Sequence, residues 1–357
     1  MSTGSVTIQQ VAVAAAVSPS TVSNYLIGRH DRMRPETQQR IAAAIAELGY
    51  RPNRAARQLR TGRVQAMGLL VPSVANPFWG AFALHLESVA LTAGYRILLC
   101  NSARSPEREM AYVEQLWDDG IRGIVLCSSL PNLDHLAPWL EQGLNLVAFD
   151  RTVQAGDPPT LVNIGVDNAI AAQLATRHLW ELGHRRLAFV SGSLNSVSRS
   201  ERFRGFANEL AAHQMPVDEA LVWSGRDTGH YGDPDLAGLG RTAVTELLAT
   251  DDPPTAVVAV NDVCALGVAA GIRDAGLRVG QDVSVTGFDD IDFSELAVPP
   301  LTTVRQPLAD LAATTFKTLR ERIDSERPLS GCSLLMHPEL VVRASTGPPR
   351  RTRGHRR

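Results

Sequence analysis

The chain has 357 residues, more than one ordinary core accommodates, so we expect about two or three domains. Hydrophobic residues make up 44% and charged residues 20% of the chain, a composition typical of a soluble globular protein. No apolar run approaches the roughly 18 residues of a membrane helix, and residues 1–10 lack the basic and apolar regions of a secretion signal, so we expect a cytoplasmic protein with no membrane partner.

The net charge of −2 is distributed unevenly along the chain. Residues 1–63 carry nine arginines against three acidic residues, a net charge of +6, and residues 348–357 carry five arginines and no acid. Residues 64–347 therefore carry a net charge of −13. Because an acidic surface repels phosphate, this distribution predicts that the N-terminal head, and not the body, binds a polyanion such as DNA.

Three short helices are predicted between residues 7 and 49. A Thr-x-x-Gln capping box at residues 7–10 begins the first helix. Ser18 caps the second, and Pro19 occupies its first position, where the missing N–H costs nothing. Pro35 begins the third helix and Gly49 ends it. A tight bend between the first two helices predicts a helix-turn-helix, whose second helix fits the major groove. A generic three-helix domain with a solvated Ser/Thr face fits the same pattern.

The segment that follows favours the DNA-binding interpretation. Asn53 is placed to cap a short helix that is rich in arginine and poor in apolar residues. Such a helix is marginal by itself and is suited to fold beside phosphates. Its single exposed Leu59 is suited to insert into the minor groove as an apolar wedge.

Residues 64–347 alternate short β-rich runs with helical patterns, which predicts α/β units around parallel sheets. The pattern pauses at residues 163–167 and restarts, which predicts two similar lobes. The predicted helices include residues 78–93 and 168–182. The predicted strands include residues 66–71, 96–99, 123–127, 146–149, 187–190, 256–260 and 284–288.

Polar side chains follow three of these strands. Asp150, Asn261 and Asp289 each close a strand, and ligands of open α/β sheets bind beyond the carboxyl ends of strands. A sugar or related polyol needs paired hydrogen-bond donors and acceptors together with a flat apolar surface. These three residues and Arg202 supply the polar groups. The aromatic candidates for the apolar surface are Phe78, Trp79 and Trp223.

Several of these residues also have a purely structural interpretation. Asn261, with the aspartate after it, can cap the following helix, and Asp289 can shape a turn. Phe78 can pack in the core of a lobe, and Trp79 lies on a different face of the same helix start. Trp223 follows two aliphatic residues, which favours a core position over a cleft position.

Other signals indicate neither a cofactor nor a reaction. Cys100, Cys127 and Cys332 lie in apolar runs, and no CxxC pair is present, so we expect buried, reduced thiols and no metal site. A GxGxxA match at residues 238–243 follows a loop instead of a strand, which argues against dinucleotide binding. No Ser/His/Asp set is indicated, so we do not expect an enzyme.

Ordered motifs along almost the whole chain resemble the lac-repressor-like (LacI/GalR) family of bacterial transcription regulators. In the head these are TIQQVA at 7–12, VSPSTVS at 17–23, RPET at 34–37 and GYRPN at 49–53, followed by Ala56, Arg57 and Leu59. In the body they include NPF at 76–78, DR at 150–151, LGHRR at 182–186, RFRGF at 202–206, ND at 261–262, GFDD at 287–290 and PLTTV at 300–304. The resemblance implies a periplasmic-binding-protein-like pair of lobes with three crossovers and a ligand in the cleft, contacted by Arg202. It also implies a minor-groove hinge at Ala56, Arg57 and Leu59.

The resemblance assigns roles within the head. In the family, the two residues after the cap serine and the one after Thr-Val-Ser read base edges, and these are Pro19, Ser20 and Asn24. Asn24 favours adenine through paired bonds to N6 and N7, whereas the family usually has Arg there, so we expect an unusual operator. The residues placed for phosphates, which position the protein without reading sequence, are Thr7, Ser18, Thr21, Ser23 and Asn53.

We therefore predict an α/β protein with an all-α helix-turn-helix head at residues 1–51 and a hinge helix and linker at 52–63. A two-lobed ligand-binding and dimerisation domain follows at 64–347, and a basic, disordered tail at 348–357. The first lobe is placed at about residues 64–162 and 293–325. The second is placed at about residues 163–290 and 326–345.

The predicted function is that of a repressor that binds a pseudo-palindromic operator as a homodimer, because one head covers only one half-site. The helices after Pro77 and Asp262 are the predicted dimer face.

A sugar-like effector in the cleft would change operator affinity. In the family, effectors that release the repressor from DNA are more frequent than effectors that strengthen its binding to DNA. The chain's one lysine, Lys317, lies away from the cleft, which modestly disfavours phosphorylated effectors. A solute-binding protein fits the lobes but not the basic head, and a sugar-processing enzyme lacks a paired carboxylate motif.

Overall fold

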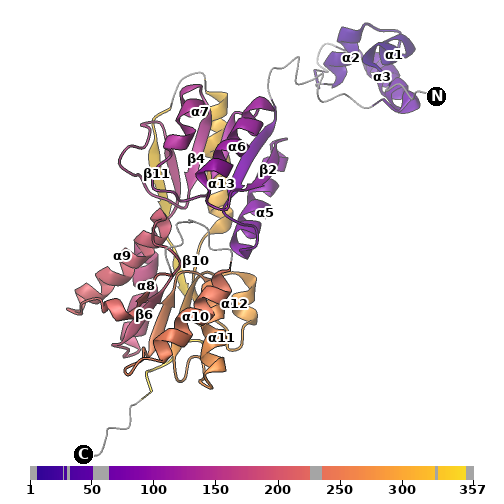
Figure 1. Ribbon diagram of the computed structural model, residues 1–357. Helices are drawn as coiled ribbons and strands as arrows, with labels where there is room; N and C mark the ends of the chain where they lie inside the picture. The colour runs from indigo at the N-terminus through magenta and orange to yellow at the C-terminus, as the bar shows by residue number, and fades with distance from the viewer. Residues whose placement is uncertain are drawn as a thin grey trace, which may run out of the picture. The chain divides into compact units, whose positions relative to one another are not determined.

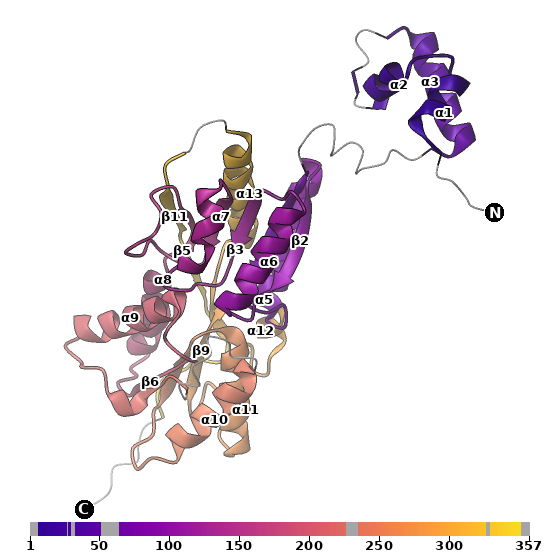
Figure 2. The same cartoon turned by 45° about the horizontal axis from the view of Figure 1, so that its top comes forward.

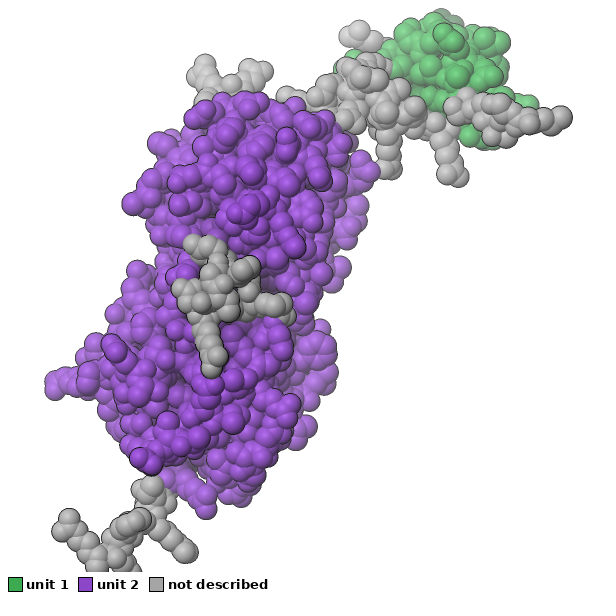
Figure 3. Space-filling view, viewed as in Figure 1, with its two compact units in different colours: residues 1–64 green, residues 65–357 purple. Residues whose placement is uncertain are grey.

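The computed structural model describes residues 6–26, 28–29, 33–50, 64–225, 235–325 and 329–350. The chain divides into two compact units, residues 1–64 and residues 65–357, which we treat separately (Figure 3). The hinge residues predicted to contact DNA lie outside the described residues, and these are Asn53, Ala56, Arg57 and Leu59.

The described part of unit 1 folds into the predicted helices α1 (Ile8–Ala14), α2 (Pro19–Leu26) and α3 (Pro35–Leu48). The capping box is confirmed, because the Thr7 N–H donates to Gln10 Oε1 (2.8 Å) and the Gln10 N–H donates to Thr7 Oγ1 (3.4 Å). Ser18 Oγ accepts from the Thr21 N–H (3.1 Å), and Gly49 ends α3 at φ 60°. The core that joins the helices contains Val11, Ala12, Ala15, Val22, Ile41 and Ala44.

In the described part of unit 2, two six-stranded sheets form two lobes (Figure 1). The first sheet is parallel throughout and has the order β11-β5-β4-β3-β1-β2. Its strands are β1 (Ala66–Val71), β2 (Arg96–Asn101), β3 (Gly123–Leu126), β4 (Asn145–Phe149), β5 (Val162–Val166) and β11 (Cys332–Met336).

The second sheet has the order β12-β10-β9-β8-β6-β7 and is parallel except for the β10–β12 pair. Its strands are β6 (Leu187–Val190), β7 (Val222–Trp223), β8 (Ala256–Ala259), β9 (Ser284–Asp289), β10 (Thr302–Arg305) and β12 (Glu339–Val341). The predicted class, helices on both faces of mostly parallel sheets, is confirmed.

Helices cover both faces of the first sheet. In β1, Met67 and Leu69 face a core shared with α5 (Pro77–Thr92) and α13 (Leu308–Asp324). Gly68 points to the other face, where a Cβ would collide with Leu116 of α6 (Pro106–Asp118). Alternate residues of a strand therefore serve two helical layers. The short helices of this lobe are η1 (Asp134–Leu136) and α7 (Ala137–Glu141).

The second sheet uses the same alternation. In β6, Leu187 and Phe189 pack with α8 (Asn168–Glu181) and α9 (Val197–Ala212). Ala188 and Val190 belong to the opposite core with α10 (Leu236–Leu248) and α11 (Asp262–Asp274), which lie side by side (Figure 2). The remaining helices of this lobe are η2 (Glu219–Leu221) and α12 (Asp292–Leu296).

The chain passes between the lobes after β5, after β10 and after β11, so the three implied crossovers are present. The lobe boundaries differ from the predicted ones. Residues 163–166, predicted to open the second lobe, complete β5 of the first sheet. Strands β10 and β11 also lie in the lobe opposite to the predicted one. A short run such as VNIGV does not reveal which of two neighbouring sheets supplies its hydrogen bonds.

The thiols are free among the described residues, but they are not uniformly buried as predicted. Cys127 and Cys264 are buried and Cys100 is half-buried, whereas Cys332 is exposed. Cys332 lies on the edge strand β11, whose first four residues are all exposed, so its apolar sequence does not imply burial. None of the described helices combines the length and apolarity needed to cross a membrane.

Candidate functional site

A cavity of about 560 Å³ lies between the two lobes of unit 2, which is within the size range of small-molecule sites. Both lobes contribute to its lining, the first from the ends of β1, β2 and β4 and the second from α9 and the ends of β8 and β9. The predicted effector-binding residues that line it are Phe78, Trp79, Asp150, Arg202, Asn261 and Asp289. The structure thus brings together residues that are distant in sequence.

Two of these residues adopt an unusual backbone conformation. Asp150, directly after β4, has φ 59°, and Asp289, at the end of β9, has φ 116°. A residue with a Cβ rarely adopts a positive φ, and the φ of Asp289 lies outside the left-handed region that aspartate tolerates. The surrounding strands hold both carboxylates at the cavity despite this strain.

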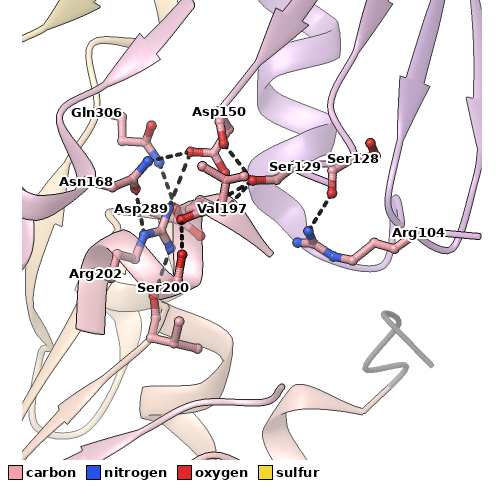
Figure 4. A network of polar contacts seen from close by, with 12 residues as sticks. Arg104, Ser128, Ser129, Asp150, Asn168, Val197, Ser200, Arg202, Asp289 and Gln306 are labelled. Carbon is pink, nitrogen blue, oxygen red and sulfur yellow. Dashed lines mark hydrogen bonds and ion pairs between the residues drawn. The ribbon is translucent and has the colours of Figure 1, made fainter. Parts of the chain in front are cut away.

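Arg202 is the centre of a polar network beside the cavity (Figure 4). Its Nε donates to Asn168 Oδ1 and its Nη1 to the Val260 carbonyl, both at 2.8 Å. Its Nη2 lies 3.6 Å from Asp150 Oδ1, which also accepts from Asn168 Nδ2 at 3.1 Å. The guanidinium lies over the Phe288 ring, 3.5 Å from its centroid. Because Asp150 belongs to the first lobe and Arg202 to the second, the network joins the lobes.

The other cavity carboxylate, Asp289, lies in an environment that disfavours its charged form. Burial raises the pKa of Asp289 well above its usual range, and the positive charge of Arg202 opposes that rise. Gln306 Nε2 donates to Asp289 Oδ1 at 2.9 Å. A carboxyl group that takes up a proton readily can donate as well as accept, which suits it to a ligand hydroxyl.

For Asn261 and Phe78, the structural and the ligand-binding interpretations hold together. Asn261 Oδ1 accepts from the Cys264 N–H (3.0 Å) and caps α11 while also lining the cavity. Phe78 and Trp79 are buried in the first core, with ring centroids 4.9 Å apart at 79°, and both border the cavity. Their rings provide a rigid apolar wall.

Trp223, a candidate for the apolar surface, is not among the described residues that line the cavity, and the core position that the sequence favoured for it is the one observed. It lies on the short edge strand β7, packs against the α10–α11 core, and donates from Nε1 to Glu246 Oε2 (2.8 Å). The sequence shows an aromatic residue after two aliphatic ones but not the side of the sheet on which it lies.

The lobes also touch at the start of α9. The Val197 N–H donates to the Ser129 carbonyl (2.9 Å), and the Ser198 N–H donates to Ser129 Oγ (3.0 Å). Ser129 belongs to the first lobe and satisfies donors that a helix N-terminus leaves open. Thr152 of the first lobe likewise donates to the carboxylate of Glu201 on α9. Separating the lobes would break these bonds, so α9 couples the cavity to the lobe arrangement.

Comparisons with known proteins identify both units. Residues 7–53 match the model of bacterial regulatory proteins of the lacI family, and residues 176–346 match the periplasmic binding protein-like domain. A relative, the HTH-type transcriptional repressor PurR of Aliivibrio salmonicida, is 33% identical over 345 residues, 95% of this chain and 98% of its own. The chain belongs to the LacI family.

Solved structures agree with this LacI-family assignment. The lac repressor dimer bound to operator and the anti-inducer ONPF has a TM-score of 0.83 at 27% identity, covering 96% of this chain and 100% of its own. The complex of the transcriptional regulator CelR with cellobiose has a TM-score of 0.68 at 30% identity, covering 95% and 99%. The LacI-family protein described here is thus a transcriptional regulator with a DNA-binding head and an effector-binding domain, and not an enzyme.

In this LacI-family head, the residues predicted to read bases are accessible. Pro19, Ser20 and Asn24 are exposed on α2. Ser18 Oγ lies 2.7 Å from Ser20 Oγ and 2.8 Å from Thr21 Oγ1, so the hydroxyls at the start of α2 form one cluster. Thr7 is exposed and Ser23 is half-buried.

Sequence reasoning missed several residues at the cavity. Asn168 donates to Asp150, and Gln306 donates to Asp289. Asn168 begins α8, the first helix after the crossover that follows β5, and Gln306 directly follows β10, where another crossover begins. Arg104, Arg108 and Arg199 line the cavity itself. The first two follow β2, whose carboxyl end meets the same edge of the sheet as that of β4, and this topological rule was a usable signal. Nothing local distinguished Arg199 from a surface arginine.

Proposed function

We propose that this protein is a repressor whose operator affinity is set by a sugar or related polyol bound between the lobes. The observation that carries the proposal is the network in which Arg202 and Asp150, from opposite lobes, meet at the cavity. Asp150, Asn261 and Asp289 offer acceptors, Arg202 offers donors, and Phe78 and Trp79 offer an apolar wall, which together match a carbohydrate ring. The similarity to the CelR–cellobiose complex supports the same ligand class.

The proposed mechanism is thermodynamic linkage between the cleft and the heads. A ligand that contacts both lobes stabilises one arrangement of them. Through residues 52–63, that arrangement would determine how well the two heads of a dimer bind the operator. A coupling of about 1–3 kcal/mol changes operator occupancy from several-fold to about a hundredfold. The ligand must therefore differ in affinity for the two lobe arrangements, and operator DNA must alter ligand affinity by the same factor.

On DNA, we propose a homodimer on a pseudo-palindromic operator, with Pro19, Ser20 and Asn24 at base edges. Thr7, Ser18, Thr21, Ser23 and Asn53 would contact phosphates, and Ala56, Arg57 and Leu59 would enter the minor groove. The dimer face is proposed on α5 and beside α11. Large apolar side chains are exposed on these surfaces, and they are Leu84, Leu91, Phe293, Leu296 and Val298.

The test begins by selecting operator DNA from a random duplex library with the full chain. Two inverted half-sites are expected in the selected sequences. Arg202→Ala should then bind this operator within about twofold of wild type, because the head does not contain Arg202. Added sugar should no longer change the operator affinity of this variant, because the cleft lacks its central donor. The matched control is Arg320→Ala, on the exposed side of α13, which should keep both properties. A normal sugar response in Arg202→Ala would place the effector site elsewhere.

A further inference from the structure

Ser129 contacts both lobes but does not contact the cavity. It lies after β3 in the first lobe, is 1% exposed, and is not among the described residues that line the cavity. Its φ is 57°, in the left-handed region that a residue with a Cβ rarely adopts. A strained backbone persists only where the surrounding structure holds it, and such residues gather at functional sites. The contacts of Ser129 explain why this conformation is kept.

The Ser129 hydroxyl makes three hydrogen-bond contacts, as many as a hydroxyl can take. Its Oγ donates to the Asp150 carbonyl (2.8 Å), accepts from the Ser198 N–H (3.0 Å) and lies 3.0 Å from Ser198 Oγ. Its main-chain carbonyl accepts from the Val197 N–H at 2.9 Å. In Figure 4, Ser129 points toward Asp150 and Val197. Ser129 thus binds the end of β4 in its own lobe and the start of α9 in the other lobe.

Among the described residues, the start of α9 receives its cap from the first lobe. The N-cap residue, Ser196, makes no side-chain capping bond, and its buried Oγ has no hydrogen-bond partner in the described chain. The first N–H groups of a helix need acceptors from outside the helix. Those of Val197 and Ser198 find both acceptors in Ser129. The cap of this second-lobe helix therefore exists only while the lobes keep this arrangement.

The same bonds hold the two residues that meet across the cleft. Ser198 and Arg202 lie one turn apart on α9, so they share a face of the helix, and both line the cavity. Ser129 binds the main chain of Asp150 on one side and Ser198 on the other. It therefore sets the separation across which Arg202 Nη2 lies 3.6 Å from Asp150 Oδ1.

We infer that Ser129 is a positioning residue for the effector site. Its bonds to Asp150, Val197 and Ser198, here called the interlobe contact, hold the lobes in the arrangement that places Asp150 opposite Arg202. The inference rests on the proposed effector role of the cleft. A ligand binds with full affinity only to molecules in the competent arrangement. Loss of the interlobe contact therefore lowers the apparent affinity for a cleft ligand, although Ser129 does not line the cavity.

The first experiment uses neither sugar nor DNA. Hydrogen–deuterium exchange with mass spectrometry follows the amides of residues 197–202 in the full chain. Ser129→Ala and Ser129→Gly both remove the hydroxyl. Each should speed exchange at these amides by about two- to thirtyfold, which is the fold-change that corresponds to a lost serine cap. Exchange in α1 of the head should stay unchanged.

The choice of variants separates the hydroxyl from the backbone strain and from burial. Glycine adopts φ 57° without strain, whereas alanine keeps the Cβ, so an effect common to both variants belongs to the hydroxyl. The matched control is Ser128→Ala. Ser128 is equally buried, and its Oγ has no hydrogen-bond partner in the described chain. Exchange and sugar affinity of this control should stay within about twofold of wild type.

The second experiment measures the affinity for glucose and for cellobiose by isothermal titration calorimetry. A sugar that binds the wild type should bind both Ser129 variants at least about threefold more weakly, because fewer molecules hold the competent arrangement. A serine that only stabilised the fold would lower the temperature of thermal unfolding and leave the sugar affinity of the folded protein unchanged. Thermal unfolding of each variant is therefore recorded beside the titrations.

Unchanged exchange at residues 197–202 in both Ser129 variants would overturn the inference, and so would a wild-type sugar affinity in both of them. Neither result touches the proposed function if a sugar still alters operator binding of the wild type. The proposed function fails separately, if the full chain selects no operator or if no cleft ligand changes operator affinity. The exchange experiment still decides in that case whether Ser129 holds the lobes together.

Discussion

Asp262, the residue after the cavity-lining Asn261, is fully buried and ties three elements together. It is the first residue of α11, and it accepts from the Ile291 N–H (2.9 Å), from Ser294 Oγ (2.7 Å) and from Thr303 Oγ1. These bonds favour the charged form, but burial outweighs them and raises its pKa from 3.8 to about 6. The group therefore links folding to pH.

The sign of this linkage follows from the direction of the shift. Because the folded state holds the proton more tightly than the unfolded state, the contribution of Asp262 to stability is full below pH 3.8 and is lost as the pH rises through about 6. Asp262→Asn removes the titration. Relative to this variant, the wild type should lose about 3 kcal/mol of unfolding free energy between about pH 3.5 and pH 7. Urea unfolding of both proteins across that range measures the difference, and parallel pH profiles would contradict the assignment.

At the scale of elements, the second lobe depends on helices that approach closely through glycine. A Cβ at Gly205 of α9 would lie 2.1 Å from the carbonyl oxygen of Ala169 in α8, which is backbone and cannot move alone. In contrast, a Cβ at Gly80 of α5 would meet nothing within 4 Å in the described chain. The same substitution therefore has opposite expected effects at the two sites.

Gly205→Ala should destabilise the protein by about 1–3 kcal/mol, because α9 must move away from α8. Gly80→Ala should stabilise it by about 0.5–1 kcal/mol through the lower backbone entropy of alanine in the unfolded chain. Chemical denaturation monitored by circular dichroism tests both variants. The packing argument is wrong if Gly205→Ala is as stable as wild type.

Local chemistry made some elements predictable and left others open. The start of α1 at Thr7, the start of α2 at Ser18 and the end of α3 at Gly49 agree with the sequence prediction, because caps act within one turn. Residues 163–166 and 332–336 were misplaced because strand pairing is a long-range choice. The exposure of Cys332 has the same origin, since burial on an edge strand depends on its neighbours.

At the scale of the whole molecule, charge is segregated between the units. Residues 1–63 carry a net charge of +6 and residues 64–347 carry −13, so the head attracts phosphate and the body repels it. Operator affinity should fall by about a hundredfold or more when salt rises from about 50 to 200 mM, because arginines that contact phosphates release counterions. Fluorescence anisotropy against the selected operator measures the slope. A complex insensitive to salt would refute the arginine-rich head as the source of affinity.

The sequence by itself determined the local elements and the family: the caps and helices of the head, most of the strands, the regulator class, and the residues at strand ends that line the cleft. These follow from interactions within a few residues and from ordered motifs. Only the tertiary structure decided the lobe of β5, β10 and β11, the absence of Trp223 from the cavity lining, and the gathering of Arg104, Arg108 and Arg199 in one cleft. Strand pairing and the meeting of the two lobes bring together residues that are far apart in the sequence. A local sequence pattern does not encode which charged side chains then line the same cavity.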